Sequence, residues 1–141
     1  MSTVVSMKTL NVEAKVQNLK QVLSFIDEEL RQENCSKKIA LQIEVAVEEL
    51  FVNIAHYAYI NDTGDVCISI SVSGDPRTAE ISFADSGTPF DPLAQTDPDV
   101  TLDAERRNIG GLGIFMVKKS MDKLLYEYRD GLNITTIRKR I

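Results

Sequence analysis

Three short segments of this chain contain residues that could bind a nucleotide and act on it. The run Glu49-Leu50-Phe51-Val52-Asn53 places a carboxylate and an amide about one helical turn apart. Asp85-Ser86-Gly87 places an acid beside a glycine, and Gly110-Gly111-Leu112-Gly113 is a glycine-rich run ahead of an expected helix. Together they could supply a general base, a metal ligand, an acceptor for adenine and a cradle for phosphates.

The first segment lies in an expected helix over residues 37 to 58, with Ser36 as its N-cap. At about 100° per residue, Glu49 and Asn53 lie about 40° apart, at the rim of the apolar face. Asn offers a neutral oxygen suited to Mg2+, and Glu can accept a proton from a hydroxyl or water. The same pair would also fit a solvated polar face. The apolar face is expected to contain Ile39, Ile43, Val47, Leu50, Ile54 and Tyr57.

The second segment follows an expected strand that ends near Asp85. A carboxylate at this position can accept a hydrogen bond from an exocyclic amine such as adenine N6. Gly87 has no Cβ, so a base could approach the backbone closely. An Asx-type turn, with no ligand, is the alternative.

The third segment precedes a helix expected over about residues 112 to 121. Glycines allow close approach, and a helix N-terminus offers free N–H groups to phosphate oxygens. A flexible hinge is the alternative. Arg106 and Arg107 lie just upstream; either could reach a terminal phosphate, and a surface role fits each equally well.

The hydrophobic pattern predicts an α+β fold, a two-layer sandwich with three main helices on one face of a mostly antiparallel, mixed sheet. A single domain is expected over residues 1 to 141. A long irregular segment, about 86 to 110, is rich in Pro, Asp, Thr and Gly, which is typical of a functional loop. The strands are expected at residues 4–11, 66–72, 78–84, 123–129 and 133–140, and the first helix at 14–33.

Composition excludes several classes of protein. The net charge of -5 argues against a nucleic-acid-binding protein, which normally presents a basic face. Cys35 and Cys67 have no CxxC or Cys/His metal spacing, which favours two free thiols in a reducing compartment. No apolar run approaches the roughly 20 residues of a membrane span, and no secretory signal is recognisable. We therefore expect a soluble cytoplasmic protein without a membrane partner.

These motifs resemble those of the GHKL ATP-binding superfamily, whose ATP pocket is the Bergerat fold. Glu49-x-x-x-Asn53 is similar to the N box of that superfamily. The first glycine box is matched by Asp85-Ser86-Gly87-Thr88-Pro89-Phe90-Asp91-Pro92, and the second by Gly111-Leu112-Gly113-Ile114-Phe115-Met116-Val117. The resemblance covers essentially the whole chain and is greatest to the anti-sigma-factor serine kinases of bacterial sporulation and stress response.

The resemblance implies a role for each matched residue, with ATP and Mg2+ as cofactors. Glu49 would be the general base and Asn53 the Mg2+ ligand. Asp85 would bind adenine N6 and Gly87 would line the base. The glycine run Gly110-Gly111-Leu112-Gly113 would cradle the phosphates, and the lid is expected over about residues 88 to 110.

The last strand departs from the superfamily, which often has a threonine that reads adenine there. This chain has Leu132-Asn133-Ile134-Thr135-Thr136 instead. In an alternating strand, Asn133 and Thr135 share a face, and either could contact the nucleotide.

A chain of 141 residues leaves no room for a phosphoacceptor helix pair or a transducer domain, so this domain is expected to act on a separate protein. The resemblance implies phosphorylation of a serine or threonine on a STAS-type anti-anti-sigma protein, sequestration of a sigma factor, and a possible homodimer. Two alternatives remain. One is a nucleotide-gated binding module without catalysis, and the other is the ATP domain of a split histidine kinase.

Overall fold

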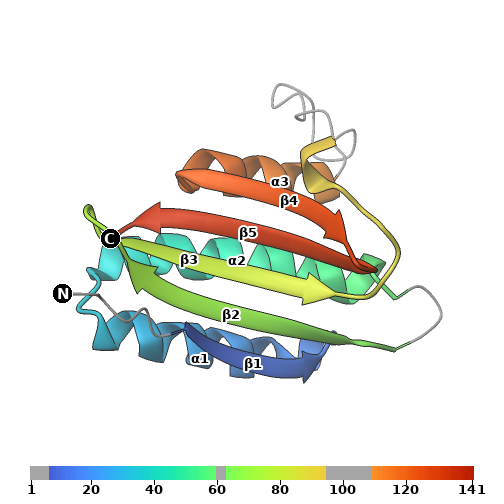
Figure 1. Cartoon of the computed structure of the whole chain (residues 1–141), viewed down its shortest axis with the longest axis horizontal. Coiled ribbons are helices and arrows are strands. Elements are labelled where there is room, and N and C mark those ends of the chain that lie inside the picture. Colours follow the sequence, from blue (N-terminus) through green and yellow to red (C-terminus); the bar gives the residue numbers. More distant parts are fainter. Residues whose placement is uncertain (1–6, 60–62, 95–108) are drawn as a thin grey trace.

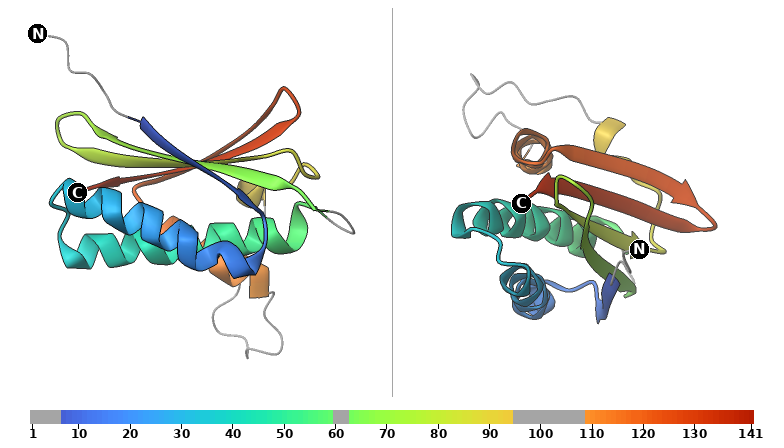
Figure 2. Two further views of the ribbon diagram at one scale, coloured as in Figure 1. Left: turned by 90° about the horizontal axis from the view of Figure 1, so that it is seen from below. Right: turned by 60° about the vertical axis from the view of Figure 1, so that its left-hand side comes forward.

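The structure is a computed structural model that describes residues 7–59, 63–94 and 109–141. These residues form one five-stranded sheet with three α-helices on one of its faces (Figure 1, Figure 2). The helices are α1 (Leu19–Gln32), α2 (Lys37–Tyr57) and α3 (Ile109–Ser120), with short 3-10 helices η1 (Val16–Asn18) and η2 (Pro92–Ala94). The strands are β1 (Met7–Glu13), β2 (Asp65–Ser73), β3 (Thr78–Asp85), β4 (Lys123–Arg129) and β5 (Leu132–Arg140). The predicted α+β class is confirmed.

The strand order is β1-β2-β3-β5-β4, and every neighbouring pair is antiparallel. The described sheet is therefore antiparallel throughout, which agrees with the prediction of a mostly antiparallel sheet but lacks the parallel pair of a mixed one. β4 and β5 are joined at Asp130 and Gly131, whose φ angles of 55° and 79° suit a tight hairpin turn. Since β5 lies between β3 and β4, its first residues lie beside the last residues of β3.

The core lies between the sheet and the helices. The helix α2 contributes several buried apolar side chains to this core, namely Ile43, Val47, Leu50 and Phe51. Phe51 is fully buried, although the predicted apolar face did not include it. The prediction for Tyr57 was wrong: its side chain is 49% exposed, because it lies in the last turn of α2 at the mouth of a pocket.

The helix starts agree with the sequence prediction for α2 and differ from it for α3. Ser36 caps α2 as predicted, since its side chain accepts a hydrogen bond from the backbone N–H of Ile39 at 3.3 Å. α3 begins at Ile109 rather than near residue 112, so the glycine run lies inside the helix and not before it.

Residues 95–108, most of the predicted lid, lie outside the described residues. None of the helices described is both long and apolar enough to span a membrane.

The seam between α1 and α2 contains two neighbouring carboxylates. Burial raises the pKa of Glu44 above its ordinary value, and the adjacent Asp27 raises it further. Arg31 forms an ion pair with Asp27, with Nε and Oδ2 2.9 Å apart, and offsets part of this repulsion. The folded protein thus binds the Glu44 proton more tightly than the unfolded chain does.

We therefore expect Glu44→Gln to stabilise the protein near neutral pH by less than about 1 kcal/mol. The raised pKa means that stability falls as pH rises from the ordinary glutamate range through the folded-state value. The gain from Gln should consequently vanish below about pH 4, where Glu44 is protonated in both states. Thermal unfolding at the two pH values would measure it. Exposed Glu48 is the matched control, and an equal gain from Glu48→Gln would contradict this account.

Candidate functional site

The end of the sheet where β3 finishes and β5 begins lies on the right in Figure 1. A pocket is lined by residues from this end of the sheet. Its walls come from the last turns of α2, the segment after β3, the start of β5 and α3. Parts of the chain far apart in sequence therefore meet at one place. The lining residues are Leu50, Asn53, Ile54, Tyr57, Ala58, Asp85, Thr88, Phe90, Pro92, Ile114, Asn133 and Thr135.

Asp85 is the buried acid of this pocket, with 4% of its surface exposed. Its Oδ1 accepts two hydrogen bonds, from the backbone N–H of Gly87 at 2.9 Å and from Asn133 Nδ2 at 3.0 Å. Asn133 lies directly opposite Asp85 in the β3–β5 register. Oδ2 accepts no hydrogen bond from the part of the chain that the structure describes. Asp85 can therefore accept one from a ligand in the pocket.

The segment after Asp85 is fastened to the end of α2. The backbone N–H of Thr88 donates to the carbonyl of Ala58 at 2.8 Å. The backbone N–H of Ser86 donates to the Tyr59 hydroxyl at 2.9 Å. A Cβ on Gly87 would overlap the Ala58 carbonyl, so glycine permits this close approach. The sequence predicts that Gly87 allows a base to approach the backbone. In the described structure, Gly87 lies close to the backbone of Ala58, at the end of α2.

Asn53 and Thr135 face the pocket from opposite walls. Asn53 lines it from α2, and Thr135 lines it from β5 with 7% of its surface exposed. The Thr135 hydroxyl makes no hydrogen bond within the described residues, so it is available to a ligand. At the mouth, the rings of Tyr57 and Phe90 stack with centroids 6.4 Å apart and planes 20° apart. This pair offers a flat apolar surface beside the pocket.

Glu49 does not line this pocket in the described structure. Its side chain lies in an adjacent apolar groove between α2 and α3, with Leu41, Val45 and Met116. A Cβ on Gly113 would overlap Glu49 Oε2, so the carboxylate rests against the backbone of α3. Glu49 and Asn53 are thus one turn apart on α2, but they border two neighbouring hollows.

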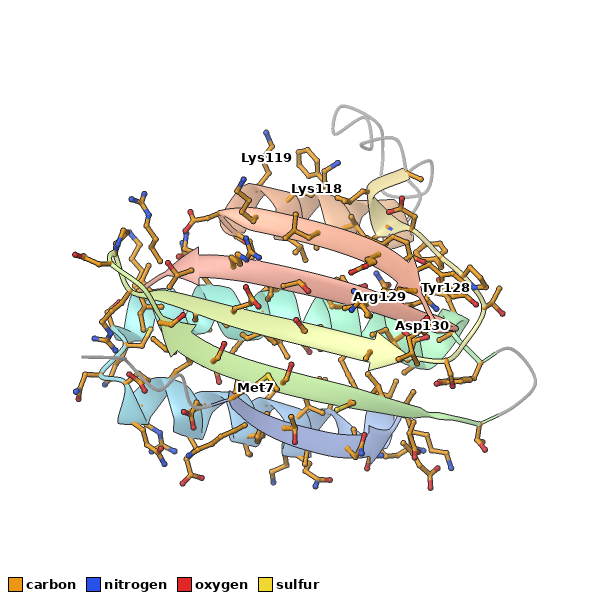
Figure 3. The ribbon with its side chains drawn as sticks, in the orientation of Figure 1. Met7, Lys118, Lys119, Tyr128, Arg129 and Asp130 are labelled. Carbon is orange, nitrogen blue, oxygen red and sulfur yellow. The ribbon has the colours of Figure 1, made fainter. Side chains whose placement is uncertain are left out.

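The remaining candidates lie on or before α3. Gly110, Gly111 and Leu112 are in the first turns of that helix. Arg106 and Arg107 lie outside the described residues. Lys118 and Lys119 lie in the last turn of α3, at the rim of the molecule (Figure 3), and Lys119 Nζ lies 5.3 Å from the Phe115 ring centroid.

One residue of the site, Tyr126, was not found from the sequence. The Tyr126 hydroxyl donates to Asn133 Oδ1, and the backbone N–H of Phe90 donates to the same oxygen at 3.2 Å. Burial raises the pKa of Tyr126 above its ordinary value, so its hydroxyl stays protonated across the neutral range. The hairpin at Asp130-Gly131 could have suggested this contact, because it sets Tyr126 opposite Thr135, two residues from Asn133.

Comparison with known families finds one model that matches most of the chain. Residues 12–139 match the model described as a histidine kinase-like ATPase domain. The predicted GHKL resemblance is confirmed.

Three curated relatives are similar to part or most of this chain. The chain is 29% identical over 97 residues to the serine-protein kinase RsbW of Listeria monocytogenes, and 27% identical over 96 residues to that of Bacillus cereus. These matches cover 65% of this chain and about 60% of each relative. The serine/threonine-protein kinase BtrW of Bordetella bronchiseptica is 21% identical over 129 residues, 92% of this chain and 90% of that protein.

A solved structure shares the fold. It contains the RsbU and RsbW domains of Rv1364c from Mycobacterium tuberculosis, and it superimposes with a TM-score of 0.66 at 17% identity. The match covers 94% of this chain and 32% of that one. The likeness establishes the arrangement of strands and helices.

Substitutions at the two site glycines, Gly87 and Gly113, are expected to change the stability of the protein by different amounts. Gly87→Ala should destabilise the protein by about 1–3 kcal/mol, because its Cβ would overlap the backbone of Ala58. Gly113→Ala should cost little, because its Cβ would overlap only the flexible end of Glu49 and alanine favours a helix by up to about 1 kcal/mol. Denaturant unfolding measures both. An equal loss of stability in the two variants would contradict this packing.

Proposed function

The chain belongs to the family of histidine kinase-like ATPase domains, and we propose that within it the chain is a Mg-ATP-dependent protein serine/threonine kinase that acts as an anti-sigma regulator. Its substrate would be a serine or threonine of a STAS-type anti-anti-sigma protein, and its second partner a sigma factor. The names of the relatives, serine-protein kinase in Listeria and Bacillus and serine/threonine-protein kinase in Bordetella, support the choice. The reaction would take place in the cytoplasm, and a homodimer is part of the proposal.

The observation that carries the proposal is that only one of the two carboxylate oxygens of Asp85 accepts hydrogen bonds from the described residues. Its Oδ1 accepts hydrogen bonds from Gly87 and Asn133, whereas Oδ2 has no donor among the described residues, and Asp85 lines the pocket. A 6-amino group of adenine would donate to Oδ2. The keto oxygen of guanine is an acceptor and would meet a carboxylate there, which disfavours it. The aromatic pair at the mouth, Tyr57 and Phe90, offers a surface for stacking.

Asn53 would hold Mg2+ together with the nucleotide phosphates. Its side-chain oxygen suits a hard cation that keeps most of its waters. The described residues include no cluster of three or more His, Cys, Asp and Glu side chains that could bind a metal unaided. A shared site made by one amide and a phosphate chain fits that donor set. Bound Mg2+ would neutralise charge on the transferring phosphoryl group.

Glu49 would remove the proton from the substrate hydroxyl. It lies one turn before Asn53 and against α3 at Gly113, beside the proposed phosphate position. The absent side chain of Gly113 leaves the space that the carboxylate occupies. The glycine run Gly110-Gly111-Leu112-Gly113 would cradle the phosphates, and Arg106 or Arg107 would neutralise charge on the terminal phosphate.

A nucleotide-gated binding module that transfers no phosphate is the second candidate. The observation in its favour is the position of Glu49, which lines the apolar groove of Leu41 and Met116 and not the pocket of Asp85. In that case Glu49 would border a protein-docking surface, and nucleotide would control its shape.

Replacing Glu49, the proposed general base, distinguishes between the kinase and the binding module. Glu49→Gln should retain ATP binding but lower phosphotransfer by about 100- to 10,000-fold, since the amide cannot accept the proton. The assay follows γ-labelled Mg-ATP to STAS-domain proteins, with Glu48→Gln as the matched neighbour on the exposed face. Acid-stable label identifies a phosphoserine or phosphothreonine, whereas acid-labile label would point to a histidine phosphotransfer partner. If native protein binds ATP but labels no protein, the kinase proposal fails and the binding module replaces it.

Replacing the adenine acceptor tests the pocket independently of catalysis. Asp85→Asn should weaken ATP binding by about 10-fold or more, because an amide would face the 6-amino group with a poorly matched donor. Calorimetry in Mg2+ buffer measures the dissociation constant. Unchanged affinity would refute the assignment of Asp85 to adenine.

A further inference from the structure

We propose that Asn133 and Tyr126 are positioning residues that orient the Asp85 carboxylate and thereby set the preference for a 6-amino purine. The inference rests on the proposed nucleotide site. It distinguishes between two residues that the strand pattern alone left equivalent.

The hydrogen-bonding capacity of Asn133 is used within the protein. Its Nδ2 faces three acceptors: Asp85 Oδ1 at 3.0 Å, the Gly87 carbonyl at 3.3 Å and the Thr88 carbonyl at 3.1 Å. Its Oδ1 faces two donors, the Phe90 N–H and the Tyr126 hydroxyl. A side-chain amide has two N–H donors and two acceptor lone pairs. Nothing remains for a direct bond to a base.

The orientation of this amide follows from partners that can act in one way only. A backbone N–H, that of Phe90, can only donate, so the atom beside it must be the oxygen. The two carbonyls of Gly87 and Thr88 can only accept, so the atom beside them must be the nitrogen. The amide nitrogen is therefore the group that contacts Asp85.

This orientation has two consequences for the pocket. The bond to Oδ1 fixes the carboxylate plane and leaves Oδ2 for the ligand. The bonds to Gly87, Thr88 and Phe90 hold the segment whose residues line the pocket. The buried side chain of Asn133 thus positions both the Asp85 carboxylate and the adjacent segment of the pocket wall. Such preorganisation is what a specific binding site requires.

Tyr126 acts on the pocket through Asn133. It lies on β4 opposite Thr135 and does not line the pocket. Its hydroxyl holds the oxygen end of the amide, which keeps the nitrogen end on Asp85. Thr135, by contrast, lines the pocket, and its hydroxyl has no hydrogen-bond partner in the described part of the chain. It can serve a ring nitrogen of the base directly.

Selectivity between ATP and ITP tests the inference, because the two nucleotides differ only at the edge of the base that would face Asp85. Adenine has a 6-amino donor and an N1 acceptor there, whereas hypoxanthine has a 6-keto acceptor and an N1–H donor. We expect Tyr126→Phe to lower the ratio of ATP to ITP affinity by about 3- to 10-fold, and Asn133→Ala by at least about 10-fold. Calorimetry on the full chain gives each dissociation constant. Tyr128→Phe is the matched control; Tyr128 lies two residues along β4, near the hairpin turn in Figure 3, with half of its surface exposed. Its ratio should not change.

The double variant determines whether Tyr126 acts through Asn133. Tyr126→Phe should have no further effect on the ratio in the Asn133→Ala background. A loss of affinity for both nucleotides by the same factor would assign these residues a purely structural role and overturn the inference. Additive changes in the ratio would also overturn it. If Asn133→Ala does not fold, the contrast between Tyr126→Phe and Tyr128→Phe still decides. If the native protein binds neither nucleotide, the proposed function itself fails.

Discussion

The hydrogen bond between the Asn133 amide and the Asp85 carboxylate is the contact on which the pocket depends. It joins the end of β3 to the start of β5, where the register sets the two residues directly opposite. Both side chains are almost fully buried, with 4% of each exposed. Buried polar groups without partners are costly, so the Asn133 amide, whose donors and acceptors all have partners, favours one arrangement over others. The pairing of β3 with β5 thus positions the acidic wall of the pocket.

The second constraint is the packing of α2 against both the sheet and α3. The apolar side chains of α2, Phe51 among them, occupy the core, and the helix presents Asn53 to the pocket. Glu49, one turn earlier, meets the backbone of α3 at Gly113. A small movement of α3 would therefore change the surroundings of Glu49 while Asn53 and Asp85 stayed in place. Because Ile114 of the same helix lines the pocket, such a movement would couple nucleotide binding to the step that Glu49 is proposed to perform.

The sequence predicts much of this architecture, because its signals are local. Alternating strands, the Ser36 cap and the Asp130-Gly131 turn each depend on a few adjacent residues, and the structure has all of them. The partnership of Asn133 with Asp85 and Tyr126 depends on three strands, so no local pattern indicates it. The glycines indicate a loop and so place the start of α3 too late, whereas Ile114 and Val117 are buried on this helix and favour it through packing. Helical periodicity places Tyr57 in the core, because periodicity does not show where the sheet ends.

The most direct test of this account is a crystal structure of the protein with Mg2+ and a non-hydrolysable ATP analogue. The account predicts that the 6-amino nitrogen of adenine lies within hydrogen-bonding distance of Asp85 Oδ2. It also predicts that the Asn133 amide stays on Oδ1 and that the Thr135 hydroxyl faces the base. Adenine bound outside the pocket, or Asn133 rotated away from Asp85 to contact the base, would contradict it.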